Sequence, residues 1–294
     1  MDVVVFGAGS LGSLIGGLLA REHVVTLVGR EDHVHAVQED GLRITGEIQA
    51  VVRPRASKTV SGAADLAIVT VKSYDTPAAV EALSGCDCDA VLSLQNGMGN
   101  EDRLSALDAM VIVGTVTYGA IQDEPGRVRC TGRGEVVLGS PDYGQSLTAN
   151  RIGEAFRAAG IETTVASDMP KRRWEKLAIN AGINATTALS RVPNGALSDG
   201  PLSDVARRAA RETARVARSR GVDLTDDDAL AALESVVDTT ADNESSMYRD
   251  VQASRRTEVD AINGYVADSA VETPVNETLA ALLRGWERES KLGK

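Results

Sequence analysis

A glycine pattern near the start of the chain constrains the fold more than any other feature. The apolar run at 3–6, Val-Val-Val-Phe, leads directly into Gly7-Ala8-Gly9-Ser10-Leu11-Gly12, and residues 13–21 are rich in Leu, Gly and Ala. An apolar run, a glycine turn and a helix-forming segment, in this order, predict a buried strand joined by a tight turn to a helix. The first thirty residues are therefore expected to open an α/β domain.

The glycine turn has the properties of a phosphate-binding loop. Its first glycine permits a sharp turn, the second lets the backbone approach a phosphate, and the third allows the helix to pack closely on the strand. The N-terminus of the following helix carries unpaired N–H groups and the positive end of the helix dipole, which both favour an anion. We expect the pyrophosphate of a dinucleotide cofactor to contact residues Gly7, Ala8, Gly9, Ser10, Leu11 and Gly12. The alternative is an ordinary βα turn.

The second predicted strand, 24–28, ends at Gly29-Arg30. In this architecture the end of that strand meets the adenosine ribose, where an acidic residue binds a free 2′-hydroxyl and an arginine accommodates a 2′-phosphate. Arg30 therefore favours NADP(H). Glu31 and Asp32 follow at once, and a shift of one residue would place a carboxylate at the ribose, so NAD(H) stays the alternative.

Three further apolar runs predict parallel strands of the same sheet, at 64–71, 90–94 and 111–116. Ligands of open α/β sheets bind outside the carboxyl ends of the strands. We therefore expect residues at these ends to line the nicotinamide and substrate sites, namely Lys72, Asn96 and Ala120. Each of them, taken singly, is equally consistent with an ordinary turn.

The pattern changes near residue 168. Before it, we expect a hairpin at 41–52, an antiparallel edge pair at 128–138, a helix at 146–159 and a strand at 162–166. Asp168-Met169-Pro170 then breaks the chain, and no βα alternation resumes. We predict a Rossmann-type dinucleotide-binding domain over 1–168 and an all-helical domain over 169–294, with helices at 202–220, 226–239 and 279–291.

One helical segment of the second domain carries a narrow polar stripe. Lys176, Asn180 and Asn184 follow one another at a spacing of four residues, which places them on one face of a helix. The residues between them are apolar or small, so the stripe is more typical of a pocket lining than of a solvated face. Partial desolvation there would make Lys176 a better proton donor near neutral pH. The chain's histidines all lie before residue 36, which makes them poor candidates for that acid.

Composition excludes several classes of function. A net charge of −11 and a pI near 4.9 disfavour nucleic acids and anionic membranes as partners. The three cysteines do not have the spacing of a disulfide framework or a zinc site, so we expect no metal and a cytoplasmic protein with reduced thiols. Neither a leader peptide nor an apolar run long enough to span a membrane is apparent. An excess of Arg over Lys, 25 to 6, with abundant acidic residues would suit a high-salt cytoplasm.

Several motifs together resemble the ketopantoate reductase (2-dehydropantoate 2-reductase) family. They are GAGSLG at 7–12, VTVKS at 69–73, LQNGMG at 94–99, WEKLAINAGINATTAL at 174–189, PNG at 193–195, SSM at 245–247 and TEVDAINGY at 257–265. The resemblance covers nearly the whole chain. It implies a helical domain similar to the C-terminal domain of 6-phosphogluconate dehydrogenase, and an NADP-dependent oxidoreductase that reduces ketopantoate to (R)-pantoate in pantothenate and coenzyme A biosynthesis.

The resemblance also implies roles for individual residues. The proton donor falls on Lys176 and a second essential carboxylate on Glu258. The implied substrate contacts are Asn96, Asn180, Asn184, Asn194 and Ser246. The implied cofactor contacts are the glycine loop 7–12, Arg30, Lys72, Asn96, Ala120 and Glu258. We expect the lysine to reach across a crevice to the nicotinamide.

Two alternatives keep parts of this interpretation. One is a related enzyme that acts on another 2-keto acid or on a β-hydroxy acid. The other is a dinucleotide-sensing regulator without turnover, which would have no use for the polar stripe. A small keto acid is the expected partner, and dimerisation through the helical half is left open because no sequence feature fixes it.

Overall fold

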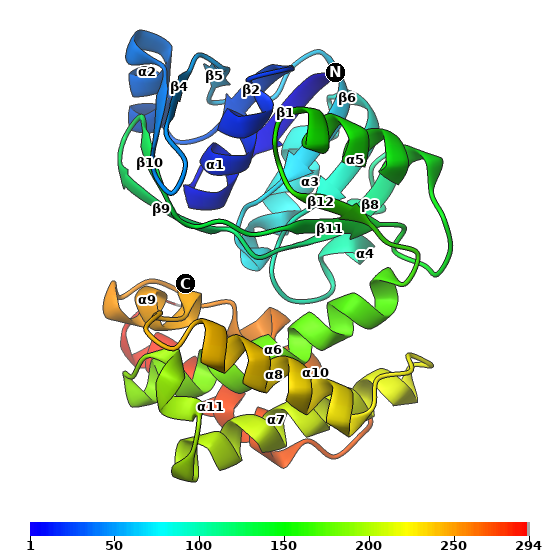
Figure 1. Ribbon diagram of the computed structural model, residues 1–294, viewed down its shortest axis with the longest axis vertical. Coiled ribbons are helices and arrows are strands. Elements are labelled where there is room, and N and C mark those ends of the chain that lie inside the picture. Colours follow the sequence, from blue (N-terminus) through cyan, green and yellow to red (C-terminus); the bar gives the residue numbers. More distant parts are fainter. Residues whose placement is uncertain (293–294) are drawn as a thin grey trace. The chain divides into compact units, whose positions relative to one another are not determined.

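The computed structural model describes residues 1–292, and its contacts divide the chain into two compact units (Figure 1). The α/β unit comprises Met1–Gln95 and Asn100–Met169. The helical unit comprises Asn96–Gly99 and the residues from Pro170 onward. The tetrapeptide Asn96–Gly99 therefore packs with the helices, although the sequence places it in the middle of the predicted dinucleotide-binding domain.

A large twisted sheet forms the centre of the α/β unit. Its strand order is β12-β11-β8-β7-β6-β1-β2-β5. The strands are β1 (Asp2–Phe6), β2 (Val24–Val28), β5 (Arg55–Ser57), β6 (Ala63–Val69), β7 (Asp87–Ser93), β8 (Met110–Val116), β11 (Val136–Gly139) and β12 (Thr163–Val165). Phe6 lies opposite both Val28 and Val69, and Val69 lies opposite Ser93. The carboxyl ends of β2, β1, β6 and β7 therefore finish level, as the sequence predicts for a Rossmann-type sheet.

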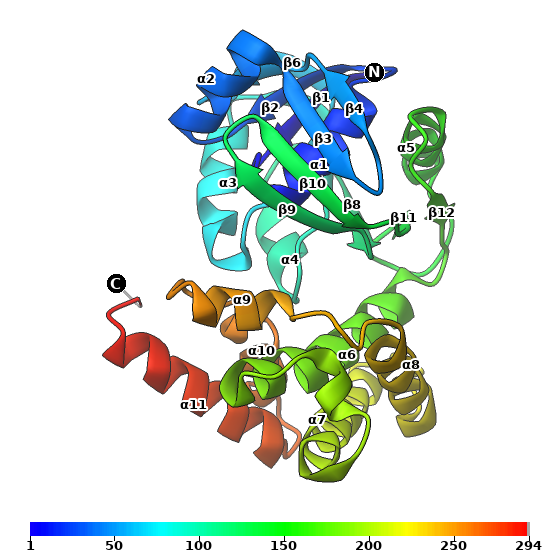
Figure 2. The same ribbon diagram turned by 60° about the vertical axis from the view of Figure 1, so that its left-hand side comes forward.

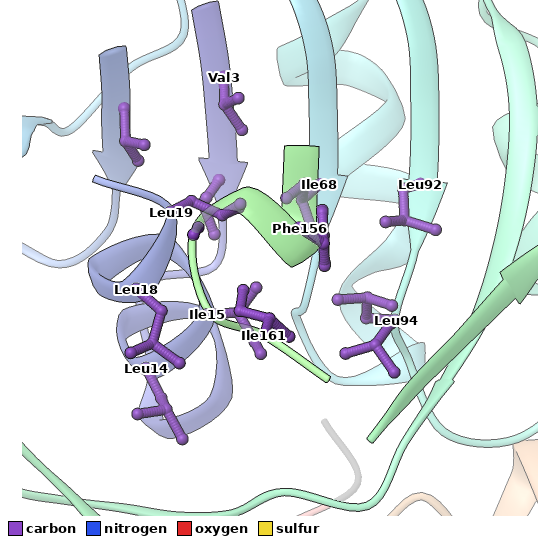
Figure 3. Close-up of a cluster of buried hydrophobic side chains, with 14 of the residues drawn as sticks. Val3, Leu14, Ile15, Leu18, Leu19, Ile68, Leu92, Leu94, Phe156 and Ile161 are labelled. Carbon is purple, nitrogen blue, oxygen red and sulfur yellow. The ribbon is translucent and has the colours of Figure 1, made fainter. Parts of the chain in front are cut away.

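Helices cover both faces of this sheet. The helices α1 (Ser10–Leu19) and α5 (Leu147–Ala158) contribute to one buried cluster, while α3 (Thr76–Leu83) and α4 (Asn100–Leu104) contribute to another on the opposite side. Figure 3 shows the first cluster, in which Phe156 of α5 lies beside Ile68 of β6; Leu14 and Ile15 of α1 belong to the same cluster. The core is built from aliphatic side chains, as the scarcity of aromatic residues requires. The helix α2 (Glu31–Asp40) follows β2 directly.

A second, four-stranded sheet was only partly expected. Its order is β4-β3-β10-β9, with β3 (Leu42–Gly46), β4 (Ala50–Val52), β9 (Gly119–Glu124) and β10 (Arg127–Gly132). The hairpin predicted at 41–52 is confirmed as the antiparallel pair β3–β4. The edge pair predicted at 128–138 is wrong, because β10 pairs with β9 and β3 whereas β11 pairs antiparallel with β8 in the large sheet. Residues 133–135 carry the chain from one sheet to the other, and alternation of side chains does not reveal this change of partner.

The helix α1 lies between the two sheets, and Figure 2 shows the smaller sheet as a layer of its own beside it. Two adjacent glycines permit this close packing. A Cβ atom on Gly16 would lie 2.5 Å from Leu27 of the large sheet, and one on Gly17 would lie 2.7 Å from Leu42 of the small sheet. Larger residues at these positions would therefore require the leucine side chains or the helix to shift.

The helical unit consists of α6 (Met169–Ser190), α7 (Gly200–Ser219), α8 (Asp226–Thr239), α9 (Ser246–Gln252), α10 (Asn263–Ala267) and α11 (Pro274–Glu289). This unit also has short helical turns at Asn194–Leu197 and Val259–Ala261, and the α/β unit has one at Ser73–Asp75. The helix α6 begins at Met169, directly after Asp168, and the contact division between the units falls between Met169 and Pro170. Pro170 occupies the first turn of α6, where its missing N–H removes no intrahelical hydrogen bond.

Small residues and buried polar contacts hold the helical unit together. Alanines of α6 and α7 belong to one buried cluster, and a Cβ on Gly182 of α6 would lie 2.8 Å from the Ala206 carbonyl of α7. The buried carboxylate of Glu212 on α7 accepts hydrogen bonds from the backbone N–H groups of Val275 and Asn276, at 3.0 and 2.9 Å. These groups belong to the first turn of α11, so Glu212 caps that helix from a neighbouring element and complements its dipole.

Candidate active site

The glycine loop of the α/β unit has a tightly fixed backbone. Gly7 has φ +107°, and the N–H groups of Gly7 and Ala8 both donate to the Val28 carbonyl, at 3.0 and 2.9 Å. Thr70 Oγ1 donates to the Gly7 carbonyl at 2.9 Å. A Cβ on Gly12 would lie 2.3 Å from that same carbonyl oxygen. The loop therefore requires glycine at both positions, for backbone conformation at Gly7 and for packing at Gly12.

The loop has room for a phosphate. A Cβ on Gly9 would meet only the Gly7 carbonyl oxygen, at 3.9 Å, so the space beside this residue is open. Gly9 is the N-cap of α1, no side chain caps this helix end, and no acidic residue occupies its first turn. The N-terminal N–H groups of a helix have no partner within the helix and favour an anion. These features fit the pyrophosphate of a dinucleotide.

Arg30 lies beside this loop. The residue before it, Gly29, packs so closely on Ala8 that a Cβ would lie 2.9 Å from the alanine methyl. Arg30 itself is exposed at the N-cap of α2 and forms no ion pair with any residue among 1–292. The neighbouring Glu31 instead pairs with Lys58 at 3.0 Å. The placement therefore favours Arg30 over Glu31 as the residue that is available to the adenosine ribose.

A partly buried polar network behind the loop was not expected from the sequence. Ser10 Oγ accepts a hydrogen bond from the backbone N–H of Gln122 on β9, at 3.0 Å. The Gln122 amide and the Gly126 N–H both lie against His33 Nδ1, at 2.6 and 3.1 Å, and His33 Nε2 is 3.0 Å from Ser13 Oγ. Because a backbone N–H can only donate, Nδ1 is an acceptor and the neutral ring carries its proton on Nε2. Burial lowers the pKa of His33.

Lys72 and Asn96 follow adjacent strands of the large sheet, as the sequence predicts. Lys72 comes after β6, at the N-cap of the helical turn Ser73–Asp75. Gln95 holds this connection, since its Nε2 donates to the Val71 carbonyl at 3.0 Å and to Thr76 Oγ1 at 2.8 Å. Asn96 comes directly after Gln95 and already belongs to the segment that packs with the helical unit.

Ala120 is placed differently from the expectation. It lies within β9, paired with Cys130 in the small sheet, rather than at the carboxyl end of a strand in the large sheet. The predicted strand ends at Val116 as β8, and the chain then begins β9 of the small sheet at Gly119, so Ala120 lies inside a strand. Any contact of Ala120 with a cofactor would therefore come from the antiparallel ribbon β9–β10.

The polar stripe of the helical unit lies on α6. Asn184 is 5% exposed, and Lys176 and Asn180 are half-buried, so these side chains do not form a solvated face. Desolvation lowers the pKa of Lys176 to about 8, from an ordinary value of 10.5. A lysine with this pKa can hold and release a proton near neutral pH, which suits a general acid.

Asn194 and Ser246 each have a polar group that is not used to hold the local backbone. Asn194 is buried, and its Nδ2 donates to Thr240 Oγ1 at 2.9 Å. Its Oδ1 has no hydrogen-bond partner among the described residues. At the start of α9, Ser245 provides the cap by accepting from the Tyr248 N–H at 3.1 Å, whereas Ser246 is exposed. The hydroxyl of Ser246 is therefore not consumed by helix capping.

Glu258 is buried and precedes the helical turn Val259–Ala261. The sequence gives no sign of what fixes this carboxylate in place. In the structure, the preceding residue Thr257 donates two hydrogen bonds to Glu287 of α11. The sequence does not predict a role for Glu287, because acidic residues are common near the end of an amphipathic helix.

The sequence matches known proteins along its whole length. The pattern of the ketopantoate reductase PanE/ApbA family matches residues 3–143, and that of the ketopantoate reductase PanE/ApbA C-terminal family matches residues 168–287. A 2-dehydropantoate 2-reductase of Halobacterium salinarum is 42% identical over 98% of this chain and 100% of its own length. The chain belongs to the ketopantoate reductase family. It is accordingly an oxidoreductase, and its relatives are named for the reduction of 2-dehydropantoate.

Solved structures of ketopantoate reductases share the fold. A family member from Ralstonia eutropha JMP134 is similar over 99% of this chain and 100% of its own, with a TM-score of 0.89 and 34% identity. A D-mandelate dehydrogenase solved with NADH and anilino(oxo)acetate has a TM-score of 0.92 over 99% of this chain and 100% of its own, at 24% identity. The second likeness extends to the fold alone.

Within residues 1–292, no helix is both long and apolar enough to cross a membrane. In the same range, no group of three or more His, Cys, Asp or Glu side chains could hold a metal ion.

Proposed function

We propose that this ketopantoate reductase reduces ketopantoate to (R)-pantoate with NADPH, and that Lys176 is the proton donor. The observation that carries the proposal is the setting of Lys176, whose pKa burial lowers to about 8 on a helix face shared with Asn180 and Asn184. The full-length match to 2-dehydropantoate 2-reductases supports the choice of substrate. The reaction is a step of pantothenate and coenzyme A biosynthesis and would take place in the cytoplasm.

The proposed cofactor site uses the glycine loop, Arg30 and Lys72. The open space at Gly9 would accept the pyrophosphate, and the exposed guanidinium of Arg30 would bind the 2′-phosphate. NADPH, when bound there, supplies the hydride that reduces the keto carbon.

The residues of the helical unit would neutralise the charge that develops on the ketone oxygen and would orient the substrate. Reduction of a ketone builds negative charge on its oxygen, and the Lys176 ammonium would neutralise that charge and release the proton from Nζ, an effect typically worth about 10²–10⁴-fold. Amide and hydroxyl groups bind the substrate's hydroxyl and carboxylate without adding a competing charge. The proposed substrate ligands are Asn96, Asn180, Asn184, Asn194 and Ser246. Glu258 would orient a substrate hydroxyl or the lysine itself.

The experiment that tests this function is an NADPH-oxidation assay with ketopantoate beside pyruvate, oxaloacetate and phenylglyoxylate. We expect the highest kcat/KM for ketopantoate. A clear preference for another keto acid would reject the substrate, and NADPH binding without turnover of any keto acid would support the regulator instead.

Replacement of Lys176 tests the mechanism. Lys176→Ala is expected to lower turnover at least about 10²-fold while NADPH still binds, because the variant removes the acid and leaves the glycine loop intact. The matched control is Lys171→Ala on the same helix, since the Lys171 ammonium pairs with Asp228 at 3.1 Å on the surface. Unchanged turnover in Lys176→Ala would place the acid elsewhere.

A further inference from the structure

A buried carboxylate of the last helix binds the residue that precedes Glu258. Glu287 Oε1 accepts hydrogen bonds from the Thr257 backbone N–H at 2.7 Å and from Thr257 Oγ1 at 2.6 Å. Glu287 is 6% exposed and Thr257 is 2% exposed. Bonds to an ionised acceptor are stronger than neutral ones, and removing that acceptor would leave two buried donors without a partner. Glu287 therefore holds Thr257 firmly.

Further hydrogen bonds connect Thr257 to the residues that follow it in the chain. Thr257 Oγ1 also accepts from the Val259 N–H at 3.3 Å, and the Ala261 N–H donates to the Glu258 carbonyl at 3.1 Å. Glu258 thus lies between an anchored residue and a short helical turn. Fixing Thr257 limits the backbone positions that Glu258 can adopt.

The same segment supports the tetrapeptide that begins with Asn96. The Met98 N–H donates to the Ala261 carbonyl at 3.0 Å. Gly97 has φ +79°, and a Cβ there would lie 2.5 Å from the same carbonyl oxygen, so the two backbones approach as closely as glycine allows. The segment Thr257–Ala261 therefore connects the Glu287 anchor to both proposed site residues, Glu258 and Asn96.

We propose that Glu287 is a positioning residue for the active site. By binding Thr257 it fixes the segment Thr257–Ala261, and through that segment it sets the positions of Glu258 and of Asn96. The inference rests on the proposed function, because it assumes that these two side chains act on the cofactor or substrate.

The test compares variants that remove or keep the two hydrogen bonds. Glu287→Ala removes the acceptor, while Glu287→Gln keeps a neutral oxygen in its place. Thr257→Val removes the hydroxyl and keeps the backbone N–H, whereas Thr257→Ser keeps both donors. We expect Glu287→Ala to lower kcat/KM for ketopantoate by about 10-fold or more. Thr257→Val should also have a lower kcat/KM than wild type, whereas Glu287→Gln and Thr257→Ser should retain most of the activity. The double variant should be no worse than Glu287→Ala, because both changes break one interaction.

Two controls separate positioning from loss of stability. Glu289→Ala changes an exposed acidic residue of the same helix and should leave kinetics unchanged. Leu230→Ala truncates a buried side chain of α8. It should lower the melting temperature yet leave kcat/KM unchanged when assayed well below the unfolding transition.

Amide hydrogen exchange gives a readout that does not depend on activity. In Glu287→Ala and Thr257→Val, the N–H groups of Met98 and Ala261 should exchange faster than in wild type, whereas Leu230→Ala should leave their protection relative to neighbouring amides unchanged.

The outcomes are distinguishable. A folded Glu287→Ala or Thr257→Val protein with wild-type kcat/KM and wild-type protection of Met98 overturns the inference. If Glu287→Ala does not fold, Thr257→Val and Thr257→Ser decide it. If the wild-type protein turns over no keto acid, the proposed function fails, and unchanged exchange at Met98 and Ala261 in the variants would overturn the structural coupling separately.

Discussion

Lys176 shows how a single residue acquires a chemical property from its surroundings. An exposed lysine is almost fully protonated at pH 8, and it gives up its proton reluctantly. The half-buried setting on α6 lowers the pKa of Lys176 to about 8 by desolvation of the ammonium. The spacing of the polar stripe is visible in the sequence, but the degree of burial depends on the packing around the helix.

This pKa predicts the pH dependence of the reaction. The ammonium form is the proton donor, and its population falls as pH rises through about 8, so kcat should fall on the alkaline side. An arginine keeps its proton far above that pH, so any residual activity of Lys176→Arg should lose this alkaline limb. A kcat profile measured with saturating substrate tests both statements. A wild-type rate that stays level or increases above pH 9 would contradict the role of Lys176.

Arg30 is the residue on which cofactor choice is proposed to depend. Arg30→Ala removes the guanidinium that would bind the 2′-phosphate, and NADH has no such group. We expect the dissociation constant for NADPH to rise at least about 10-fold, since charge-assisted bonds to phosphate contribute about 1.5–3 kcal/mol, while that for NADH changes little. Fluorescence titration with both nucleotides measures the difference, and equal losses would remove Arg30 from the 2′-phosphate site.

At the scale of secondary structure, the small sheet is joined to the glycine loop by His33 and Gln122. His33 on α2 bridges Ser13 of α1 and the β9–β10 ribbon, and Gln122 of β9 donates its backbone N–H to Ser10. Protonation of His33 would put an N–H on Nδ1, which already faces two donors, the Gln122 amide and the Gly126 N–H. The neutral ring therefore matches the packing of these elements and the charged ring opposes it.

The consequence is a loss of stability in acid. The pKa of His33 is lowered in the folded protein, so the unfolded chain binds more protons at and below its ordinary pKa of 6.5. The His33 contribution to stability is present above about pH 6.5 and is lost as pH falls below it. The melting temperature of His33→Gln should depend less on pH between 7.5 and 5 than that of wild type. His35→Gln, at an exposed position of the same helix, is the control; equal slopes for wild type and His33→Gln would contradict the assignment.

At the scale of the whole molecule, the excess of negative charge is the dominant long-range electrostatic feature. The chain carries a net charge of −11, and the ion pairs among its described residues are mostly exposed, as with Arg127–Glu124 and Arg218–Asp226. Exposed pairs contribute only about 0–1 kcal/mol each, whereas a large net charge destabilises the compact state through self-repulsion. Screening should therefore favour folding overall.

The matching prediction concerns salt. Raising KCl from about 0.05 to about 1 M shortens the Debye length to about 3 Å, and the melting temperature at pH 7.5 should rise. Near the pI of about 4.9 the same change should have a smaller effect, because the net charge is then close to zero. A melting temperature that falls with KCl at pH 7.5 would show that the exposed ion pairs outweigh the repulsion.

The sequence by itself determined the local elements and the family. Period-two and period-3.6 patterns, the glycine loop and the spacing of Lys176, Asn180 and Asn184 are properties of short segments, so they can be read before the chain is folded. The predicted strand 24–28 and helix 226–239 agree with β2 and α8 to the residue. The order of the family motifs along the chain identified the ketopantoate reductases.

Only the tertiary structure decided which distant segments meet. The separation of β10 from β11, the placement of Ala120 in the small sheet, and the packing of Asn96–Gly99 with the helices depend on pairing partners that side-chain alternation does not encode. The same holds for the contacts of Thr257 with Glu287, which lie thirty residues apart in sequence. Hydrogen bonds of this kind are formed by groups that are common on any protein surface. They become specific only when folding removes these groups from water and leaves them to pair with one another.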